Sequence, residues 1–159
     1  MINAATSSVE DTRDLAATIA ALAAPGDLIV LAGDLGTGKT AFAQGFARGL
    51  GVDEPVTSPA FILVRTYDGR LPLVHLDVYR LDTMQELVDL GISELLDEGA
   101  VTLVEWGDAV TPALPPDYLE VRLEAPGAPD DRRLAIRSVG PAWPPRADAL
   151  RLALAPWTV

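Results

Sequence analysis

The sequence contains no cysteine, one histidine and one lysine, and each scarcity excludes a class of site. Without cysteine the chain has no disulfide, no thiolate zinc site and no thiol nucleophile. Because His75 is the only imidazole, a metal site built from several histidines is also excluded. The only lysine is Lys39, so the Asn-Lys-x-Asp motif that reads guanine, which needs a second lysine, is missing. A GTPase is therefore disfavoured.

Long apolar segments are missing as well. No stretch reaches about 18 uninterrupted apolar residues, the length that a membrane-spanning helix needs. The start of the chain has no basic region followed by a long apolar core. We therefore expect a soluble cytoplasmic protein without membrane association. Its 159 residues, 49% of them hydrophobic, suffice for one compact domain over residues 1–159.

Positive charge is scarce, and the formal net charge is −11. No Lys or Arg occurs between Arg80 and Arg122, a stretch that contains ten Asp and Glu residues. Nucleic-acid-binding domains normally have a basic face, so we expect any nucleic acid to be contacted only indirectly, through a partner. The acidic stretch is either a solvated surface or a docking surface for a basic partner.

The first half of the chain predicts a helix, a strand, a glycine-rich turn and a second helix. Thr6-Ser7-Ser8 precedes an apolar helical periodicity that ends at Pro25-Gly26, so we expect an N-capped helix. The short apolar run 27–33 has the pattern of a strand that is covered on both faces. Glycines follow at once, and residues 40–51 have helical spacing again.

The second half alternates strands with helices. We expect strands in 60–67 and 71–77, joined by a hairpin turn at residues 68–70. Two short helices in 82–99, broken at Gly91 and with Asp82 as the first N-cap, and a buried strand in 100–105 follow. An antiparallel pair in 118–125 and 132–140 and a final helix in 145–155 complete the prediction. Such alternation predicts an α/β fold, namely a P-loop NTPase-like three-layer sandwich. Its central sheet is expected to be mostly parallel, with an antiparallel strand pair and flanking helices.

The segment "GDLGTGKT" matches the phosphate-binding pattern G-x-x-x-x-G-K-[ST] in the required strand–turn–helix context. Glycines allow successive backbone N–H groups to converge on phosphate oxygens, and the positive end of the following helix adds to the attraction. Lys39 supplies a compact ammonium that reaches the β- and γ-phosphates, where a planar guanidinium would be too bulky. The residues expected at the phosphates of ATP or ADP are Leu35, Gly36, Thr37, Gly38, Lys39, Thr40 and Ala41.

Two acids occupy the positions that a magnesium site needs. Asp77 and Glu105 each end a predicted strand, so both are expected at the sheet edge that carries the glycine-rich turn. Together with the Thr40 hydroxyl they are candidate ligands of Mg²⁺, which takes few protein ligands and keeps several waters. One acid would order the Mg²⁺ shell and the other would position the attacking water. Lys39, Asp77 and Glu105 are thus the candidate catalytic residues.

Two further residues lie close to the candidate acids in the sequence. His75 is expected to be a packed, hydrogen-bonded core histidine. Trp106 either packs against the sheet or contacts the nucleotide.

Taken together, "GDLGTGKT", "VTSPAFILV", "HLDVYRL" and "ELVDLGISELLDEGAVTLVEW" resemble the TsaE (YjeE-type) family, the P-loop ATPase subunit of the bacterial machinery that makes N6-threonylcarbamoyladenosine on tRNA. The resemblance implies an Mg-ATPase that associates with TsaD-like and TsaB-like subunits and resets their complex between rounds. It implies contact with tRNA only indirectly, through that complex. It also implies that Thr12 and Arg132 touch the nucleotide, that Thr40 and Glu105 serve Mg²⁺, and that Asp77 holds the Walker B-like position.

One motif departs from the family pattern. Family members commonly have Ser-Pro-Thr after the helix that follows the phosphate-binding turn, whereas this chain has Ser58-Pro59-Ala60. If the missing threonine senses the γ-phosphate or Mg²⁺, then Thr57 or Ser58 must replace it, or hydrolysis is slower.

Two alternative functions remain open at this point. A small-molecule kinase would use the same phosphate loop, but such kinases gather arginines around the acceptor, and residues 81–121 contain none. A non-catalytic module whose nucleotide switches its affinity for a partner is compatible with every motif above.

Overall fold

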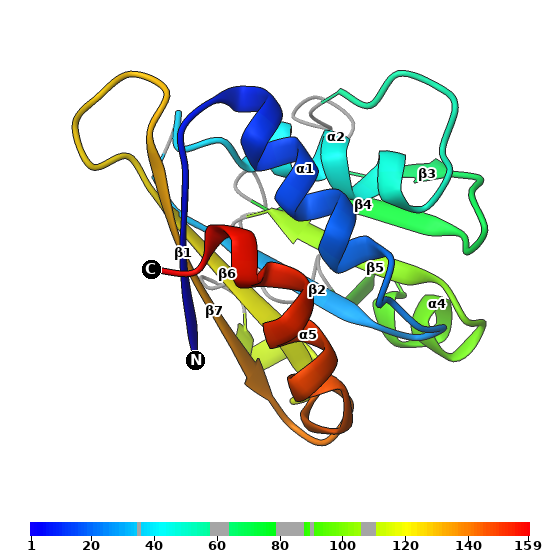
Figure 1. Cartoon of the computed structure of the whole chain (residues 1–159). Helices are drawn as coiled ribbons and strands as arrows, with labels where there is room; N and C mark the ends of the chain where they lie inside the picture. Colours follow the sequence, from blue (N-terminus) through cyan, green and yellow to red (C-terminus); the bar gives the residue numbers. More distant parts are fainter. Residues whose placement is uncertain (35, 58–63, 79–87, 90, 106–110) are drawn as a thin grey trace.

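The structure is a computed structural model that describes residues 1–34, 36–57, 64–78, 88–89, 91–105 and 111–159 (Figure 1). Its centre is a seven-stranded sheet with the order β1-β7-β6-β2-β5-β4-β3. The strands are β1 (Ile2–Thr6), β2 (Leu28–Ala32), β3 (Val64–Tyr67), β4 (Leu73–Asp77), β5 (Val101–Glu105), β6 (Tyr118–Glu124) and β7 (Arg132–Val139).

The sheet is mixed, and its parallel part is central. Strands β6, β2, β5 and β4 run parallel to one another, while β1–β7, β6–β7 and β3–β4 are antiparallel pairs. Every residue of β2, β4 and β5 is buried, as the continuous apolar runs predict. The carboxyl ends of the four parallel strands therefore meet along one edge of the sheet.

Two hydrophobic clusters occupy the two faces of the sheet. The first includes Phe42 and Phe46 and joins the sheet to α1 (Val9–Ala20), α2 (Lys39–Gly49) and α5 (Ala147–Leu154), the helices drawn in front of the sheet in Figure 1. The second includes Ile92 of α4 (Ile92–Asp97). Short 3₁₀ segments are η2 (Thr111–Ala113), η3 (Pro144–Arg146) and η4 (Ala155–Trp157).

Helices α1 and α2 cross at very short range. A Cβ atom added at Gly45 would clash with the backbone of Arg13, and one at Gly49 would lie 2.5 Å from the carbonyl oxygen of Ala17. At the rim of the crossing, Arg48 donates to Glu10, and this hydrogen bond lowers the pKa of that carboxyl below its usual value. Only glycine allows the two backbones to approach this closely.

The residue before helix α5 forms an ion pair with the residue before strand β2. Arg146 pairs with Asp27 through two hydrogen bonds of 2.6 and 2.8 Å, and its guanidinium lies 3.8 Å from the centroid of the Trp143 ring. Near the end of the chain, the Trp157 indole N–H donates to Asp11 at 2.8 Å. Contacts more than 100 residues apart in sequence thus fix the C-terminal helical segments to the start of β2 and to α1.

Most predicted elements are confirmed, and one strand was missed. Ser8 caps α1, accepting a hydrogen bond from the Asp11 N–H, and β6 and β7 form the predicted antiparallel pair. Gly91 is left-handed and precedes α4, as the predicted break requires. The antiparallel β3–β4 pair confirms the hairpin that is predicted at residues 68–70. The sheet is mixed and not mostly parallel, because the unpredicted strand β1 adds a further antiparallel pair with β7. The predicted helix before Gly91, with Asp82 as its cap, lies largely outside the described residues.

No helix in the described ranges has both the length and the apolar character needed to cross a lipid bilayer.

Candidate functional site

A glycine-rich loop joins the carboxyl end of β2 to the start of α2. Gly33, Gly36 and Gly38 have φ values of 141°, 77° and 101°, which side chains rarely allow. At Gly33 space is also limiting, since a Cβ would lie 2.5 Å from the Leu123 carbonyl oxygen. Helix α2 begins after Gly38, and no side chain caps its start.

Lys39 lies across this loop. Its ammonium donates hydrogen bonds of 2.7 Å to the carbonyl oxygens of both Gly33 and Asp34, and only 6% of the residue is exposed. The short, nearly equal contacts suit a compact charge at the end of a flexible stem. The loop therefore holds its cation at its centre.

Two more side chains fix the shape of the loop. The Thr37 hydroxyl donates to the Asp34 carbonyl oxygen at 2.7 Å. Arg132, at the start of β7, donates to the carbonyl oxygens of Thr37 at 3.0 Å and Gly36 at 3.2 Å. Arg132 thus contacts the backbone of the loop, and a direct contact with nucleotide stays a prediction.

Asp77 and Glu105 end neighbouring parallel strands at the same level. They are direct partners in the β4–β5 register, and Glu105 is also opposite Leu31 of β2, one residue before that strand ends. Asp77 is 6% and Glu105 3% exposed. Both acids therefore lie at the sheet edge from which the glycine-rich loop departs, as the strand pattern predicts.

The available donors fit a magnesium ion that is held mostly by water and phosphate. Among the residues whose positions are described, no group of three or more His, Cys, Asp or Glu side chains is arranged for a metal. What the sheet edge offers is the pair Asp77 and Glu105, with Thr40 in the first turn of α2. Mg²⁺ needs only one or two carboxylates and dehydrates reluctantly, so this donor set is compatible with it.

The remaining predicted site residues have different surroundings. Thr12 is buried on α1, where its hydroxyl forms a 2.7 Å hydrogen bond with that of Thr6. Ala41 lies in the first turn of α2, and Thr57 is exposed in the segment after that helix. The predictions for Leu35, Ser58, Ala60 and Trp106 concern residues outside the described ranges.

A cleft of about 550 Å³ lies beside Arg132. It is formed where β1 ends, where β7 begins and where η4 carries Trp157. Small-molecule sites commonly have volumes of about 300–1,000 Å³. The cleft is therefore large enough for part of a nucleotide whose phosphates occupy the loop.

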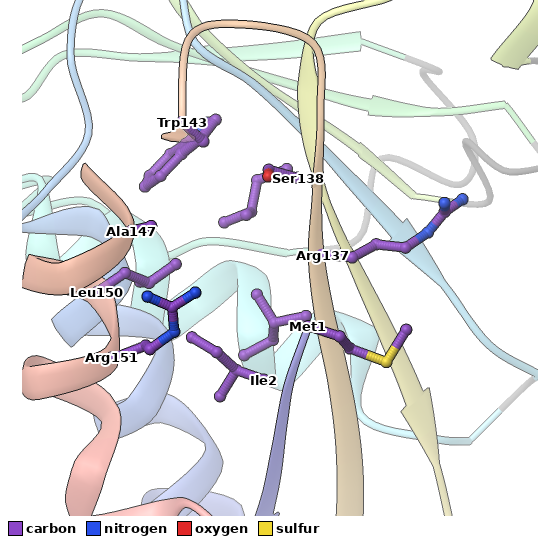
Figure 2. A pocket seen from close by; sticks show the side chains of 10 residues that line it. Met1, Ile2, Arg137, Ser138, Trp143, Ala147, Leu150 and Arg151 are labelled. Carbon is purple, nitrogen blue, oxygen red and sulfur yellow. The ribbon is translucent and has the colours of Figure 1, made fainter. Parts of the chain in front are cut away.

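A second pocket is unsuited to this role. Figure 2 shows it between α5 and the strands β1 and β7, with the side chains of Ile2, Trp143 and Leu150 around it. Its volume is about 50 Å³. It is also lined by Leu119, which is opposite Ile29 in the register with β2 and so lies toward the strand end remote from the loop.

Two residues near the site have contacts that the sequence did not predict. His75, expected as a hydrogen-bonded core histidine, is fully buried, and its Nε2 lies 2.6 Å from Oε2 of Glu105. Gln44 accepts from Arg13 on α1 and donates to the Val56 carbonyl oxygen, next to Thr57. The only sequence signal was a polar residue within an apolar strand or helix pattern.

A family model described as "Threonylcarbamoyl adenosine biosynthesis protein TsaE" matches residues 6–134. The chain belongs to the TsaE family. Among its relatives, the tRNA threonylcarbamoyladenosine biosynthesis protein TsaE of Bacillus subtilis is 43% identical over 132 residues, covering 82% of each chain. TsaE of Treponema pallidum is 42% identical over 108 residues, covering 68% of this chain and 80% of the relative.

A solved structure agrees with the family assignment. The crystal structure of Bacillus subtilis YdiB superimposes with a TM-score of 0.79 at 36% sequence identity, covering 98% of this chain and 97% of the other. The resemblance inferred from the phosphate loop, the "HLDVYRL" segment and the "VEW" segment is therefore confirmed at the level of the family.

Proposed function

We propose that this TsaE-family chain is an Mg²⁺-dependent ATPase that works in the biosynthesis of N6-threonylcarbamoyladenosine on tRNA. In this proposal it acts on a complex of TsaD-like and TsaB-like subunits and contacts tRNA only through them. The names of the relatives support the pathway. The geometry of the loop supports nucleotide binding.

The observation that carries the proposal is the ammonium of Lys39 inside a loop of left-handed glycines at an uncapped helix start. The two carbonyl oxygens that hold the ammonium are replaceable partners. A phosphate oxygen in the loop would offer Lys39 a charged acceptor, and hydrogen bonds between charged groups are stronger than those to carbonyls. The backbone N–H groups of the loop would also donate to the phosphates.

The sheet edge would complete the site. Thr40 and Glu105 would hold Mg²⁺, with Asp77 beside them, and the bound ion would neutralise charge on the β- and γ-phosphates. Asp77 or Glu105 would orient the attacking water. The nucleoside would extend past Arg132 toward the cleft of about 550 Å³ and Thr12.

The test of binding is a calorimetric titration with ATP and with ADP in magnesium buffer, for the parent and for Lys39→Ala. We expect the variant to lose at least about tenfold in affinity, because a charge-assisted contact is removed. Arg151→Ala is the control, since that side chain is 61% exposed on α5. A parent that ignores both nucleotides would overturn the proposal.

The test of activity is phosphate release from Mg-ATP, with and without the two partner subunits. Stimulation by the partners, together with modified adenosine on tRNA, supports the proposed role. Transfer of phosphate to a metabolite would instead identify a small-molecule kinase. Nucleotide-dependent partner binding without hydrolysis would identify a switch module.

A further inference from the structure

His75 and Glu105 form a buried side-chain pair across two parallel strands. The imidazole is 0% exposed and the Glu105 side chain 4% exposed. His75 is opposite Leu103 in the β4–β5 register, so its ring contacts a residue two positions further toward the site edge. The pair thus links the core of the sheet to the edge where the glycine-rich loop begins.

The surroundings of the ring decide which group donates. Nδ1 of His75 is buried without a hydrogen-bond partner, whereas Nε2 lies 2.6 Å from Glu105 Oε2. A proton on Nδ1 would be a buried N–H without an acceptor, which is costly, whereas an unpaired nitrogen lone pair costs less. We assign the proton to Nε2, which makes His75 the donor and the Glu105 carboxylate the acceptor.

This contact restrains Oε2 of the Glu105 carboxylate and does not involve Oε1. Among the described residues, none forms a hydrogen bond with Oε1 of Glu105. A carboxylate at a strand end rotates about its terminal torsion unless a partner fixes it. With Oε2 restrained by His75, Oε1 is the oxygen that remains for a ligand at the sheet edge.

We propose that His75 is the positioning residue for Glu105, orienting its carboxylate for Mg²⁺ or an Mg²⁺-bound water in the nucleotide site. This inference rests on the proposed function, since it concerns how the same site holds its metal ion. Residues that hold a metal ligand in place commonly change metal affinity 10–100-fold when they are replaced. In this inference His75 acts only through its contact with Glu105.

The test compares His75→Gln with His75→Asn. Both variants carry an amide, but only glutamine is long enough to place an N–H near the position of Nε2. The readout is binding of a fluorescent ADP analogue, measured in EDTA and then across a range of Mg²⁺ concentrations. Thr102→Val is the matched control, because Thr102 is a fully buried β5 residue whose hydroxyl has no partner.

We expect His75→Asn to require about tenfold more Mg²⁺ for half of the effect on nucleotide binding, with its affinity in EDTA unchanged. His75→Gln should remain within about threefold of the parent, and Thr102→Val should match the parent. Thermal melting shows which proteins are folded.

Several results would overturn the inference. The two amide variants could need equal Mg²⁺, or His75→Asn could lose binding equally in EDTA, which would indicate a purely structural role. A folded His75→Phe with the Mg²⁺ requirement of the parent would have the same meaning. If the parent binds nucleotide with no effect of Mg²⁺, only this inference fails, whereas a parent that binds no nucleotide removes the proposed function as well.

Discussion

Lys39 is the residue at which the chemistry of this chain is most specific. Apart from His75, all other basic side chains in the sequence are arginines, yet the centre of the loop has an ammonium. The contacts explain the choice, because one Nζ atom lies 2.7 Å from two different carbonyl oxygens. A planar, forked guanidinium could not occupy the same point with 6% exposure.

We therefore predict that Lys39→Arg, which keeps the charge, impairs nucleotide binding nearly as much as Lys39→Ala. The loss should exceed about tenfold in the calorimetric titration, while the melting temperature without nucleotide stays close to that of the parent. Affinity of Lys39→Arg equal to that of the parent would show that charge alone suffices and that the fit of the ammonium is unimportant.

At the same scale, local chemistry was predictable and distant contacts were not. The glycines, Lys39 and Thr40 lie within eight consecutive residues, so their pattern is visible in the sequence. The contact of His75 with Glu105 spans 30 residues, and that of Arg132 with the Thr37 carbonyl oxygen spans 95. Such pairs depend on strand register, which a single sequence does not specify.

Among the elements, α2 contacts both the phosphate loop and helix α1. Its first turn receives the phosphate loop, and its middle crosses α1 at a distance that Gly45 makes possible. The crossing also brings Gln44 to Arg13 and to the Val56 carbonyl oxygen. The helix that begins at the loop is therefore fixed along its length by its neighbour.

We predict that Gly45→Ala destabilises the protein by about 1 to 3 kcal/mol, since a Cβ would clash with the Arg13 backbone. Without the clash, alanine in a helix would stabilise by about 0.5 to 1 kcal/mol, so the sign is diagnostic. Urea denaturation measures the difference. Arg48→Ala, one turn away at the exposed rim, should have a small effect. Higher stability of Gly45→Ala would contradict the close crossing.

The elements also show where sequence patterns reach their limit. Helix α1 was predictable because Ser8 and the apolar periodicity are local signals. Strand β1 was not, because "INAAT" combines alanine and asparagine, which have little preference for strands. Its partner β7 is more than 120 residues away, and pairing with β7 makes this short segment an outermost strand of the sheet.

Across the whole molecule, the order of the strands determines where chemistry takes place. The parallel strands β6, β2, β5 and β4 have their carboxyl ends on one edge of the sheet. Helix α5 packs in the same hydrophobic cluster as residues of β7. Arg146 and Asp27 join the final helical segment to the entrance of β2 across 119 residues. The Asp27 side chain is 4% exposed.

We predict that Arg146→Met destabilises the protein by about 3 to 5 kcal/mol, because it leaves the Asp27 carboxylate buried without its partner. Adding Asp27→Asn should recover part of this loss, and the double-mutant cycle in urea measures the coupling. Arg151→Met is the matched comparison, since its partner Asp148 is fully exposed and the pair contributes little. Equal effects of the two arginine variants would contradict the prediction.

The single, fully buried imidazole has a practical consequence for spectroscopy. A ¹H–¹⁵N NMR spectrum of the ring contains one set of signals, with no overlap and no assignment problem. Because Nε2 lies 2.6 Å from Glu105, those resonances should respond to any change at that carboxylate. The protein thus carries its own unmodified probe of the sheet edge.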